Sequence, residues 1–227
     1  MPTCLITGAN RGLGLEFAKQ YAADDWKVIA TCRRPDAAEA LAALEGSIQI
    51  YPLDVTDFAR VEQLARKLSG EAIDLLINNA GGSGPRVTTY NSVDYAAWSE
   101  VLRVNTMAPL KMSAAFVDHL ARGQDRKIVT ISSKMGSMAD NTSGGAYIYR
   151  SSKAAVNAVM KSLSMDLRDQ NVIVVVLNPG WVRTEMGGPG ATIDAFESVA
   201  GMRDVIDNLS IEDSGRFLHY DGTEISW

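Results

Sequence analysis

The chain has few of the residues on which several enzyme classes depend. Its 227 residues include two cysteines, Cys4 and Cys32, and two histidines, His119 and His219. Two cysteines are too few for a disulfide framework or a cysteine-based zinc site, and no His-x-x-x-His or Cys-x-x-Cys pair is present, so we expect no metal centre. The Gly-x-Ser-x-Gly segment typical of many serine hydrolases is also absent.

Charge and hydrophobic runs exclude further classes. The net charge is −5, from 22 basic and 27 acidic residues, so the chain lacks the overall basic charge of a nucleic-acid-binding protein. The longest aliphatic run, Val172 to Leu177, is far too short to cross a bilayer. The first residues, MPTCLITG, lack the basic and apolar regions of a signal peptide. We therefore expect a cytoplasmic enzyme or binding protein, with no nucleic-acid or membrane partner.

Short β-branched runs alternate with helical stretches along the chain, and several runs are continuously apolar, which is typical of strands buried on both faces. The alternation predicts an α/β fold: a single doubly wound Rossmann domain over residues 1–227, with a seven-stranded, mostly parallel sheet and helices on both faces. The expected strands are 3–7, 27–32, 47–52, 75–78, 127–132, 172–178 and 216–220, and the expected helices lie near 12–24, 36–45, 57–69, 92–121, 149–169 and 194–209.

A glycine-rich turn, TGANRGLG, follows the first expected strand. Gly8 permits a tight turn, Gly12 lets the backbone approach a pyrophosphate, and Gly14 lets the next helix pack close to the sheet. The helix N-terminus offers unpaired N–H groups to phosphates. The spacing is not the common Gly-x-Gly-x-x-Gly, but its place between a strand and a helix predicts a dinucleotide site. Asn10, Arg11 and Leu13 complete the residues expected there.

The second expected strand ends in ATCRRP, without the acidic residue that accepts the ribose 2′-hydroxyl of NAD. It offers Arg33 and Arg34 instead, with Arg11 in the glycine turn. Arginine binds a 2′-phosphate through paired hydrogen bonds. The pattern therefore favours NADP(H), with NAD(H) possible, and the alternative is that these arginines only face solvent.

Tyr149 and Lys153 stand four residues apart at the start of an expected helix, so they share a face. They follow a strand that ends in Ser132 and Ser133, near the edge where open α/β sheets bind ligands. Bringing the tyrosine pKa from about 10 to about 7 needs about 4 kcal/mol. One ammonium at about 4 Å supplies that order of energy at an effective dielectric near 20. The spacing therefore predicts a tyrosine general acid whose pKa Lys153 lowers.

Together these motifs resemble the short-chain dehydrogenase/reductase family. The matching segments, in the family's order, are TGANRGLG at 7–14, LDV at 53–55, NNAG at 78–81, VN at 104–105, ISS at 131–133, YRSSK at 149–153 and NPGWVRT at 178–184. Within the family, GGAYIYRSSKAAVN, NPGWVRTEMGG and YDGTEISW resemble the sniffer-type carbonyl reductases and the C-factor-like proteins.

The resemblance implies a role for each site residue. Tyr149 would exchange a proton with the substrate oxygen, and Lys153 would lower the tyrosine pKa and hold the nicotinamide ribose. Ser133 would hydrogen-bond the substrate oxygen, and Asn105 would hold a water behind Lys153. Further cofactor contacts would come from Asp54, Val55, Asn79, Ala80, Gly81, Pro179, Gly180, Val182 and Thr184.

Several of these assignments have structural alternatives. Asn78 and Asn79 could serve only to bond the sheet, Asp54 could end its strand, and Asn105 could be an ordinary helix residue. Thr184 could be a loop cap. Ser132 could replace Ser133, and strand alternation allows only one of the two to face the substrate.

The chain departs from the family in two places. The interval between Ser133 and Tyr149 is longer than usual, and DNTSGG at 140–145 reads as an inserted rim loop. The substrate loop, about 185–200, is short, which implies an open pocket.

The resulting hypothesis is an NADPH-dependent carbonyl reductase that acts on a small-molecule ketone or aldehyde. The alternatives are an NAD(P)-dependent alcohol dehydrogenase and a cofactor-binding, C-factor-like signalling protein. The resemblance also implies a homodimer or homotetramer formed through the helices at 92–121 and 149–169. The small residues Ala114, Ala115, Ala154 and Ala158 would allow close packing there, unless they face the sheet.

Overall fold

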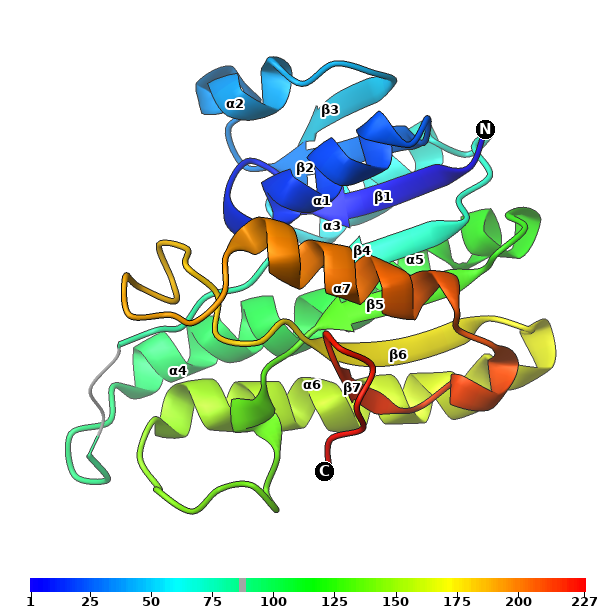
Figure 1. Ribbon diagram of the computed structural model, residues 1–227. Coiled ribbons are helices and arrows are strands. Elements are labelled where there is room, and N and C mark those ends of the chain that lie inside the picture. Colours follow the sequence, from blue (N-terminus) through cyan, green and yellow to red (C-terminus); the bar gives the residue numbers. More distant parts are fainter. Residues whose placement is uncertain (86–88) are drawn as a thin grey trace.

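Seven strands form one sheet in the order β3-β2-β1-β4-β5-β6-β7 (Figure 1). The computed structural model describes residues 1–85 and 89–227. All pairings between these strands are parallel, so the predicted, mostly parallel sheet is confirmed and is fully parallel. The strands are β1 Thr3–Thr7, β2 Lys27–Cys32, β3 Ile48–Pro52, β4 Leu75–Asn78, β5 Lys127–Ile131, β6 Ile173–Asn178 and β7 Phe217–His219.

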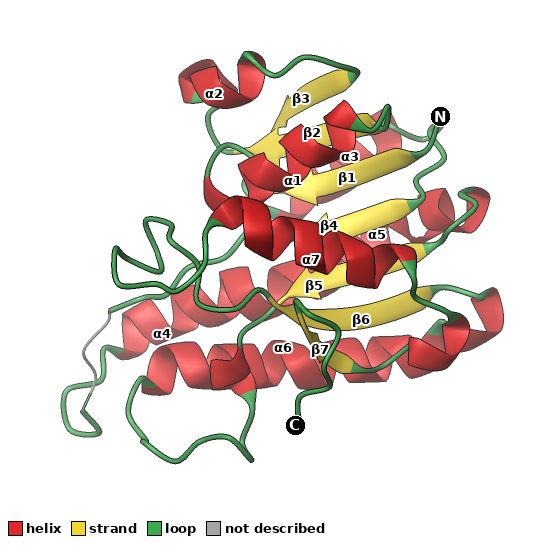
Figure 2. Cartoon of the chain, in the orientation of Figure 1, coloured by secondary structure: helices red, strands yellow, loops and turns green. Residues whose placement is uncertain are grey.

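Helices cover both faces of the sheet (Figure 2). One face packs against α1 and α7, and the other packs against α3, α5 and α6. The helices are α1 Gly12–Ala23, α2 Glu39–Ala42, α3 Phe58–Lys67, α4 Tyr95–Leu102, α5 Ala108–Arg122, α6 Tyr147–Asp166 and α7 Ala195–Asp207. This arrangement confirms the doubly wound Rossmann prediction. Among the described residues, no helix has the length and apolar character needed to cross a membrane.

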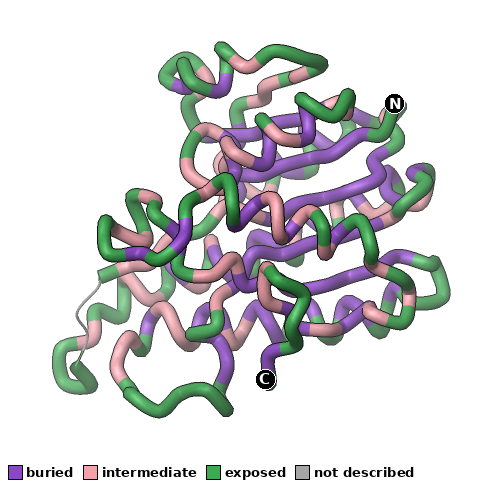
Figure 3. Tube along the Cα trace, in the orientation of Figure 1, coloured by how far each residue is buried: buried purple, intermediate pink, exposed green. Residues whose placement is uncertain are grey.

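The continuous apolar runs of the central strands β1, β4, β5 and β6 are explained by burial on both sides. Leu5 and Ile6 are adjacent in β1 and fully buried, yet they belong to the two different cores, because successive side chains of a strand point to opposite faces. Figure 3 shows the central strands buried, whereas the edge strand β3 and many of the loops are intermediate or exposed.

Two expected helices differ from the prediction. The stretch 36–45 forms only a three-residue turn, Pro35–Ala37, and the four-residue α2, since Ala38 and Leu41 supply little apolar surface to the core. The expected helix 92–121 is divided into α4 and α5 by a wide π-turn, Arg103–Met107. Pro109, early in α5, has no N–H to donate to the carbonyl of Asn105, which accounts for the irregular turn.

The parallel arrangement brings the carboxyl ends of all the strands to one edge. β1 pairs with β2 on one side and with β4 on the other, so the chain changes direction along the sheet at β1. A crevice at such a switch point is the usual ligand site of an open α/β sheet. The loops that follow β1, β2, β4, β5 and β6 all meet there.

Candidate active site

Three glycines shape the turn after β1. Gly8 and Gly12 have φ values of 65° and 54°, in the left-handed region that glycine adopts without strain. A Cβ on Gly14 would lie 2.3 Å from the carbonyl oxygen of Gly8, so only glycine lets α1 begin this close to the turn. Within the part of the chain that the structure describes, no side chain caps the N-terminus of α1 at Arg11, and its first N–H groups and the open backbone fit a phosphate ligand.

The turn is held to β4 by a threonine and an asparagine. Asn79 Nδ2 donates to the carbonyls of Thr7 (2.9 Å) and Gly8 (3.1 Å), and Thr7 Oγ1 accepts from the N–H groups of Asn79 and Ala80, both at 3.0 Å. Asn78 points the other way, and its Nδ2 donates to Ser113 Oγ at 3.2 Å. Both asparagines therefore make hydrogen bonds that stabilise the fold, as expected if their role is structural. Of the two, Asn79 is the one that lies beside the crevice.

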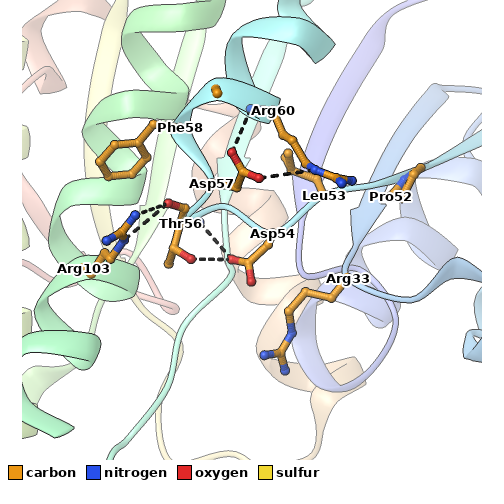
Figure 4. A pocket seen from close by; sticks show the side chains of 10 residues that line it. Arg33, Pro52, Leu53, Asp54, Thr56, Asp57, Phe58, Arg60 and Arg103 are labelled. Atoms are coloured by element: carbon orange, nitrogen blue, oxygen red, sulfur yellow. Dashed lines mark hydrogen bonds and ion pairs between the residues drawn. The ribbon is translucent and has the colours of Figure 1, made fainter. Parts of the chain in front are cut away.

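A pocket of about 680 Å³ opens beside the ends of β2 and β3 (Figure 4). Asp54 lies in its wall, and Asp54 Oδ1 accepts from the N–H (2.9 Å) and the hydroxyl (2.7 Å) of Thr56. Burial alone would raise the Asp54 pKa, but the Thr56 bonds and the charges of Arg33 and Arg103 hold that pKa below its ordinary value. The pocket is lined by Arg33, Pro52, Leu53, Asp54, Thr56, Asp57, Phe58, Ala59, Arg60 and Arg103.

The arginines around this pocket differ in their partners. Arg60 Nε lies 3.2 Å from Asp57 Oδ2, and Arg103 Nη2 donates to the carbonyl of Thr56 at 2.9 Å. Arg33 and Arg34 are exposed, and within residues 1–85 and 89–227 their side chains have no hydrogen bond or ion pair. Two guanidinium groups at the end of β2 are therefore available to an anionic ligand.

Arg11 is not available in the same way. Its guanidinium forms an ion pair with Glu185, in the loop that follows β6. The sequence predicts a cofactor contact for Arg11 and offers no sign of this partner, because 174 residues separate the two along the chain.

The loop after β6 lies close to the glycine turn. Thr184 Cγ2 would be 3.7 Å from a Cβ placed on Gly12. Thr184 Oγ1 accepts from the N–H of Gly187 at 3.1 Å, and Val182 forms an isolated bridge with Ile193. Thr184 thus caps its own loop, as expected if its role is structural, and its side chain also faces the glycine turn after β1. Gly180, with φ of 81°, provides the bend out of β6.

Lys153 is buried beside Tyr149 in the first turns of α6. Its Nζ donates to the carbonyl of Ile131 at 2.9 Å and lies 5.8 Å from the centre of the Tyr149 ring. The lysine is 6% exposed, and burial lowers its pKa from 10.5 to about 8.

The Tyr149 pKa differs from the sequence-based expectation. Burial raises it above its ordinary value, and a hydrogen bond with Ser133 is the one effect that opposes the rise. Lys153 does not lower it here, because the ammonium is directed to the Ile131 carbonyl. The expectation of an acidic phenol is therefore wrong for this arrangement, whereas the proximity of Tyr149, Ser133 and Lys153 is found.

The two serines after β5 point in different directions. Ser132 Oγ donates to Asn157 Oδ1 at 2.7 Å and is buried between β5 and α6. Ser133 Oγ accepts from the N–H of Met135 at 3.2 Å, and Ser133 lies close enough to Tyr149 to lower the pKa of the tyrosine. Of the two, Ser133 is therefore the serine that lies beside the tyrosine.

Asn105 lies in the π-turn behind Lys153 and is 1% exposed. Its Nδ2 donates to the Gly82 carbonyl (2.8 Å) and to Ser152 Oγ (2.9 Å), and its Oδ1 accepts from the Gly82 N–H (2.9 Å). Both amide hydrogens are thus used by the protein itself. Asn105 is not an ordinary helix residue, since it links the β4 loop to α6.

Sequence reasoning missed Ser152 as a site residue. Ser152 is fully buried, its Oγ donates to the Tyr149 carbonyl at 2.8 Å, and the same Oγ accepts from Asn105. Its place in the YRSSK segment was the available signal.

Among the described residues, no group of three or more His, Cys, Asp or Glu side chains is placed to hold a metal ion.

Comparison with known proteins places this site in a family. The family described as short chain dehydrogenase matches residues 2–192. The C-signal protein of Myxococcus xanthus is 48% identical over 155 residues, which cover 68% of this chain and 93% of that protein.

Two solved structures cover the whole chain. Carbonyl reductase Sniffer of D. melanogaster is 34% identical, with a TM-score of 0.92 and coverage of 100% of both chains. An NADPH-bound carbonyl reductase from chicken fatty liver is 38% identical, with a TM-score of 0.90 and coverage of 100% of this chain and 99% of that chain. The chain belongs to the short-chain dehydrogenase/reductase family, and these similarities confirm the sniffer-type and C-factor-like resemblance of its motifs.

Proposed function

We propose that this oxidoreductase is an NADPH-dependent carbonyl reductase, which converts a ketone or an aldehyde to the alcohol. The observation that carries the proposal is the meeting of Tyr149, Ser133 and Lys153 at the carboxyl edge of the sheet, on the same edge as the glycine turn. When bound, the reduced nicotinamide would supply the hydride.

Tyr149 donates its hydroxyl proton to the oxygen of the substrate carbonyl as negative charge develops there. Burial raises the Tyr149 pKa, so the phenol keeps its proton at neutral pH and is ready to act as a general acid. Ser133 donates a second hydrogen bond to the same oxygen. Lys153, with a pKa of about 8, is mostly an ammonium at pH 7 and would hold the nicotinamide ribose.

The unpartnered arginines support the choice of NADP(H) over NAD(H). Arg33 and Arg34 are exposed at the end of β2, no acidic residue takes their place, and each offers the planar group that binds a phosphate. NAD(H) would leave both guanidinium groups without a ligand. The proposed cofactor residues are Gly8, Asn10, Arg11, Gly12, Leu13, Gly14, Arg33, Arg34, Asp54, Val55, Asn79, Ala80, Gly81, Tyr149, Lys153, Pro179, Gly180, Val182 and Thr184.

The test is a cofactor titration followed by a carbonyl screen. We expect NADPH to bind at least about tenfold more tightly than NADH, in line with the worth of charged hydrogen bonds, and to be oxidised in the presence of an aldehyde or ketone. Tighter binding of NADH would overturn the cofactor assignment. NADPH binding without oxidation, over a panel of aliphatic, aromatic and dicarbonyl substrates, would favour the signalling alternative.

Two rival functions are separable by measurement. An alcohol dehydrogenase would reduce NADP⁺ with alcohols faster than it oxidises NADPH with the matching carbonyls under equal saturation. A cofactor-binding signalling protein is suggested by the name of the Myxococcus relative. Such a protein has no need of Tyr149, Ser133 and Lys153 close together, and their proximity favours the enzyme.

We also propose a homodimer or homotetramer formed through α5 and α6. Ala114 and Ala158 are exposed on these helices, as a close helix contact requires, whereas Ala115 packs partly against the core. Sedimentation equilibrium would reveal a monomer if the proposal is wrong.

The two cysteines are buried and unbonded, in keeping with the cytoplasm as the proposed location. The proposed substrate loop, about 185–200, spans the loop after β6 and the first turn of α7. We propose the whole of 1–227 as one cofactor-binding domain.

A further inference from the structure

The segment YDGTEISW, at 220–227, has no part in the chemistry proposed above. After β7 the chain turns at Gly222, where φ is 84°, and runs back beside the strand. The N–H of Ile225 donates to the Phe217 carbonyl at 2.8 Å, and the Trp227 ring stacks on Phe217 with centroids 5.5 Å apart. We call residues 223–227 the return segment.

The return segment bonds directly to the loop that follows Ser133. Ser137 Oγ donates to the Ser226 carbonyl at 2.6 Å, and the N–H of Ala139 donates to the Trp227 carbonyl at 3.0 Å. Ser137 Oγ also accepts from the N–H of Asp140 at 3.1 Å, and Ser137 is 2% exposed. One buried hydroxyl therefore bonds both the loop and the segment.

The other side of the same loop rests on the catalytic elements. The N–H of Lys134 donates to Asn178 Oδ1 at 3.0 Å. Gly136 lies so close to α6 that a Cβ there would be 2.8 Å from the carbonyl carbon of Lys153. Loop 134–140 is thus held between α6 and β6 on one side and the return segment on the other.

Among the residues that the structure describes, the hydrogen bonds between the loop and the return segment come from Ser137 and Ala139. A pocket of about 320 Å³ is lined by residues of both, Lys134, Ser137, Ala139, Asp140 and 223–226, together with His219. The Lys134–Asp140 ion pair, at 3.3 Å, is half exposed and lies within the loop, so it does not attach the loop to the return segment. The buried bonds of Ser137 therefore carry much of the attachment, because a buried polar group left without its partner costs more than an exposed one.

We propose that Ser137 is a positioning residue through which the return segment holds loop 134–140 and keeps the Ser133 hydroxyl at Tyr149. The inference rests on the proposed function, because it assumes that Ser133 and Tyr149 act on one substrate oxygen. Ser137 itself touches neither substrate nor cofactor.

The first test needs no catalysis. Hydrogen exchange of the amides of 134–140 is measured on the protein without cofactor, in wild type, Ser137→Ala and the matched control Ser162→Ala, an exposed serine of α6. We expect exchange at 134–140 to rise roughly five- to tenfold in Ser137→Ala, the effect of about one net hydrogen bond, with α1 unchanged. Unchanged exchange at 134–140 would overturn the proposal.

The second test is a double-mutant cycle on turnover. We expect Ser137→Ala to lower kcat about tenfold, short of the ~10²-fold that a 1 Å misplacement can cost, with an NADPH Kd near that of Ser162→Ala and a stability loss of about 1–2 kcal/mol. Trp227→Ala should lower kcat similarly, and Trp227→Phe, which keeps a ring on Phe217, should not. Because both changes release the same loop, the double variant should be no slower than the slower single variant.

The outcomes separate the two proposals. Additive effects, or a kcat for Ser137→Ala within twofold of wild type, would overturn the positioning role. If wild-type protein reduces no carbonyl at all, the proposed function fails and the role of Ser133 fails with it, while the exchange experiment still decides whether Ser137 holds the loop.

Discussion

The Lys153 ammonium lies 5.8 Å from the centre of the Tyr149 ring and donates to the carbonyl of Ile131, 2.9 Å away. The lysine is therefore anchored to β5, and Ser133 is the neighbour of the tyrosine that opposes the rise of its pKa. Such an arrangement suits an acid that must keep its proton until the substrate arrives. The proposed role of Lys153 is then to hold the nicotinamide ribose.

Replacing the tyrosine tests this division of labour. Tyr149→Phe removes the proton donor and leaves the ring in place, so we expect kcat to fall by roughly 10²–10⁴, the usual worth of a general acid. The NADPH Kd should change by less than about threefold. Fluorescence titration and initial rates measure the two quantities, and a rate within tenfold of wild type would contradict the assignment.

The buried lysine makes stability depend on pH in a particular direction. Its folded pKa, about 8, lies below the ordinary 10.5, so the unfolded chain binds the proton more tightly between these values and stability rises as the pH rises through that window. Below pH 8 the buried charge costs about 3 kcal/mol, since each pH unit corresponds to about 1.4 kcal/mol.

Lys153→Met removes the cost of burying the charge, but it also removes the hydrogen bond to the Ile131 carbonyl. The loss of that bond reduces the gain in stability by about 1 kcal/mol. We therefore expect the variant to be about 1–2 kcal/mol more stable than wild type in urea unfolding at pH 7, and to lose this advantage by pH 10. Lys19→Met, at an exposed position of α1, controls for the loss of a lysine. An equal stability difference at both pH values would show that burial does not lower the pKa of Lys153.

The two adjacent serines allow a matched comparison. Ser133→Ala removes the partner of Tyr149, so we expect kcat to fall at least about tenfold with an almost unchanged melting temperature. Ser132→Ala removes the buried bond to Asn157, so we expect a loss of about 1–2 kcal/mol in stability and a kcat within about threefold of wild type. The opposite pattern would mean that Ser132 faces the substrate.

Much of the scaffold could be predicted from local pattern. The strands Thr3–Thr7, Lys27–Cys32 and Leu75–Asn78 begin and end at the expected residues, because burial on both faces makes the whole strand apolar. The break between α4 and α5 was missed, since the helical pattern of 92–121 continues through the turn and only Pro109 marks it.

The sequence predicts which residues lie together at the site, but not the hydrogen bonds and ion pairs that they form. The motifs bring Ser133, Tyr149 and Lys153 to one edge, yet a hydroxyl bond or a pKa depends on the environment of each side chain. The ion pair of Arg11 with Glu185 joins residues 174 positions apart, and the bond of Ser137 to Ser226 joins residues 89 apart. The spacing of residues within a motif cannot predict contacts between residues so far apart along the chain.

Arg33 and Arg60 line the same pocket (Figure 4) but differ in what they already bind. Arg60 is paired with Asp57, whereas Arg33 has no hydrogen-bonded partner among the described residues. If the pocket receives the 2′-phosphate of NADPH, Arg33→Ala should weaken NADPH binding by about tenfold or more, the worth of a charged hydrogen bond, and change NADH binding by less than about twofold. Arg60→Ala, with the same change of charge in the same pocket, should affect both cofactors alike. Isothermal titration with each cofactor measures these affinities. Equal loss for NADPH and NADH in Arg33→Ala would mean that Arg33 contributes general positive charge and that the choice between the cofactors is made elsewhere.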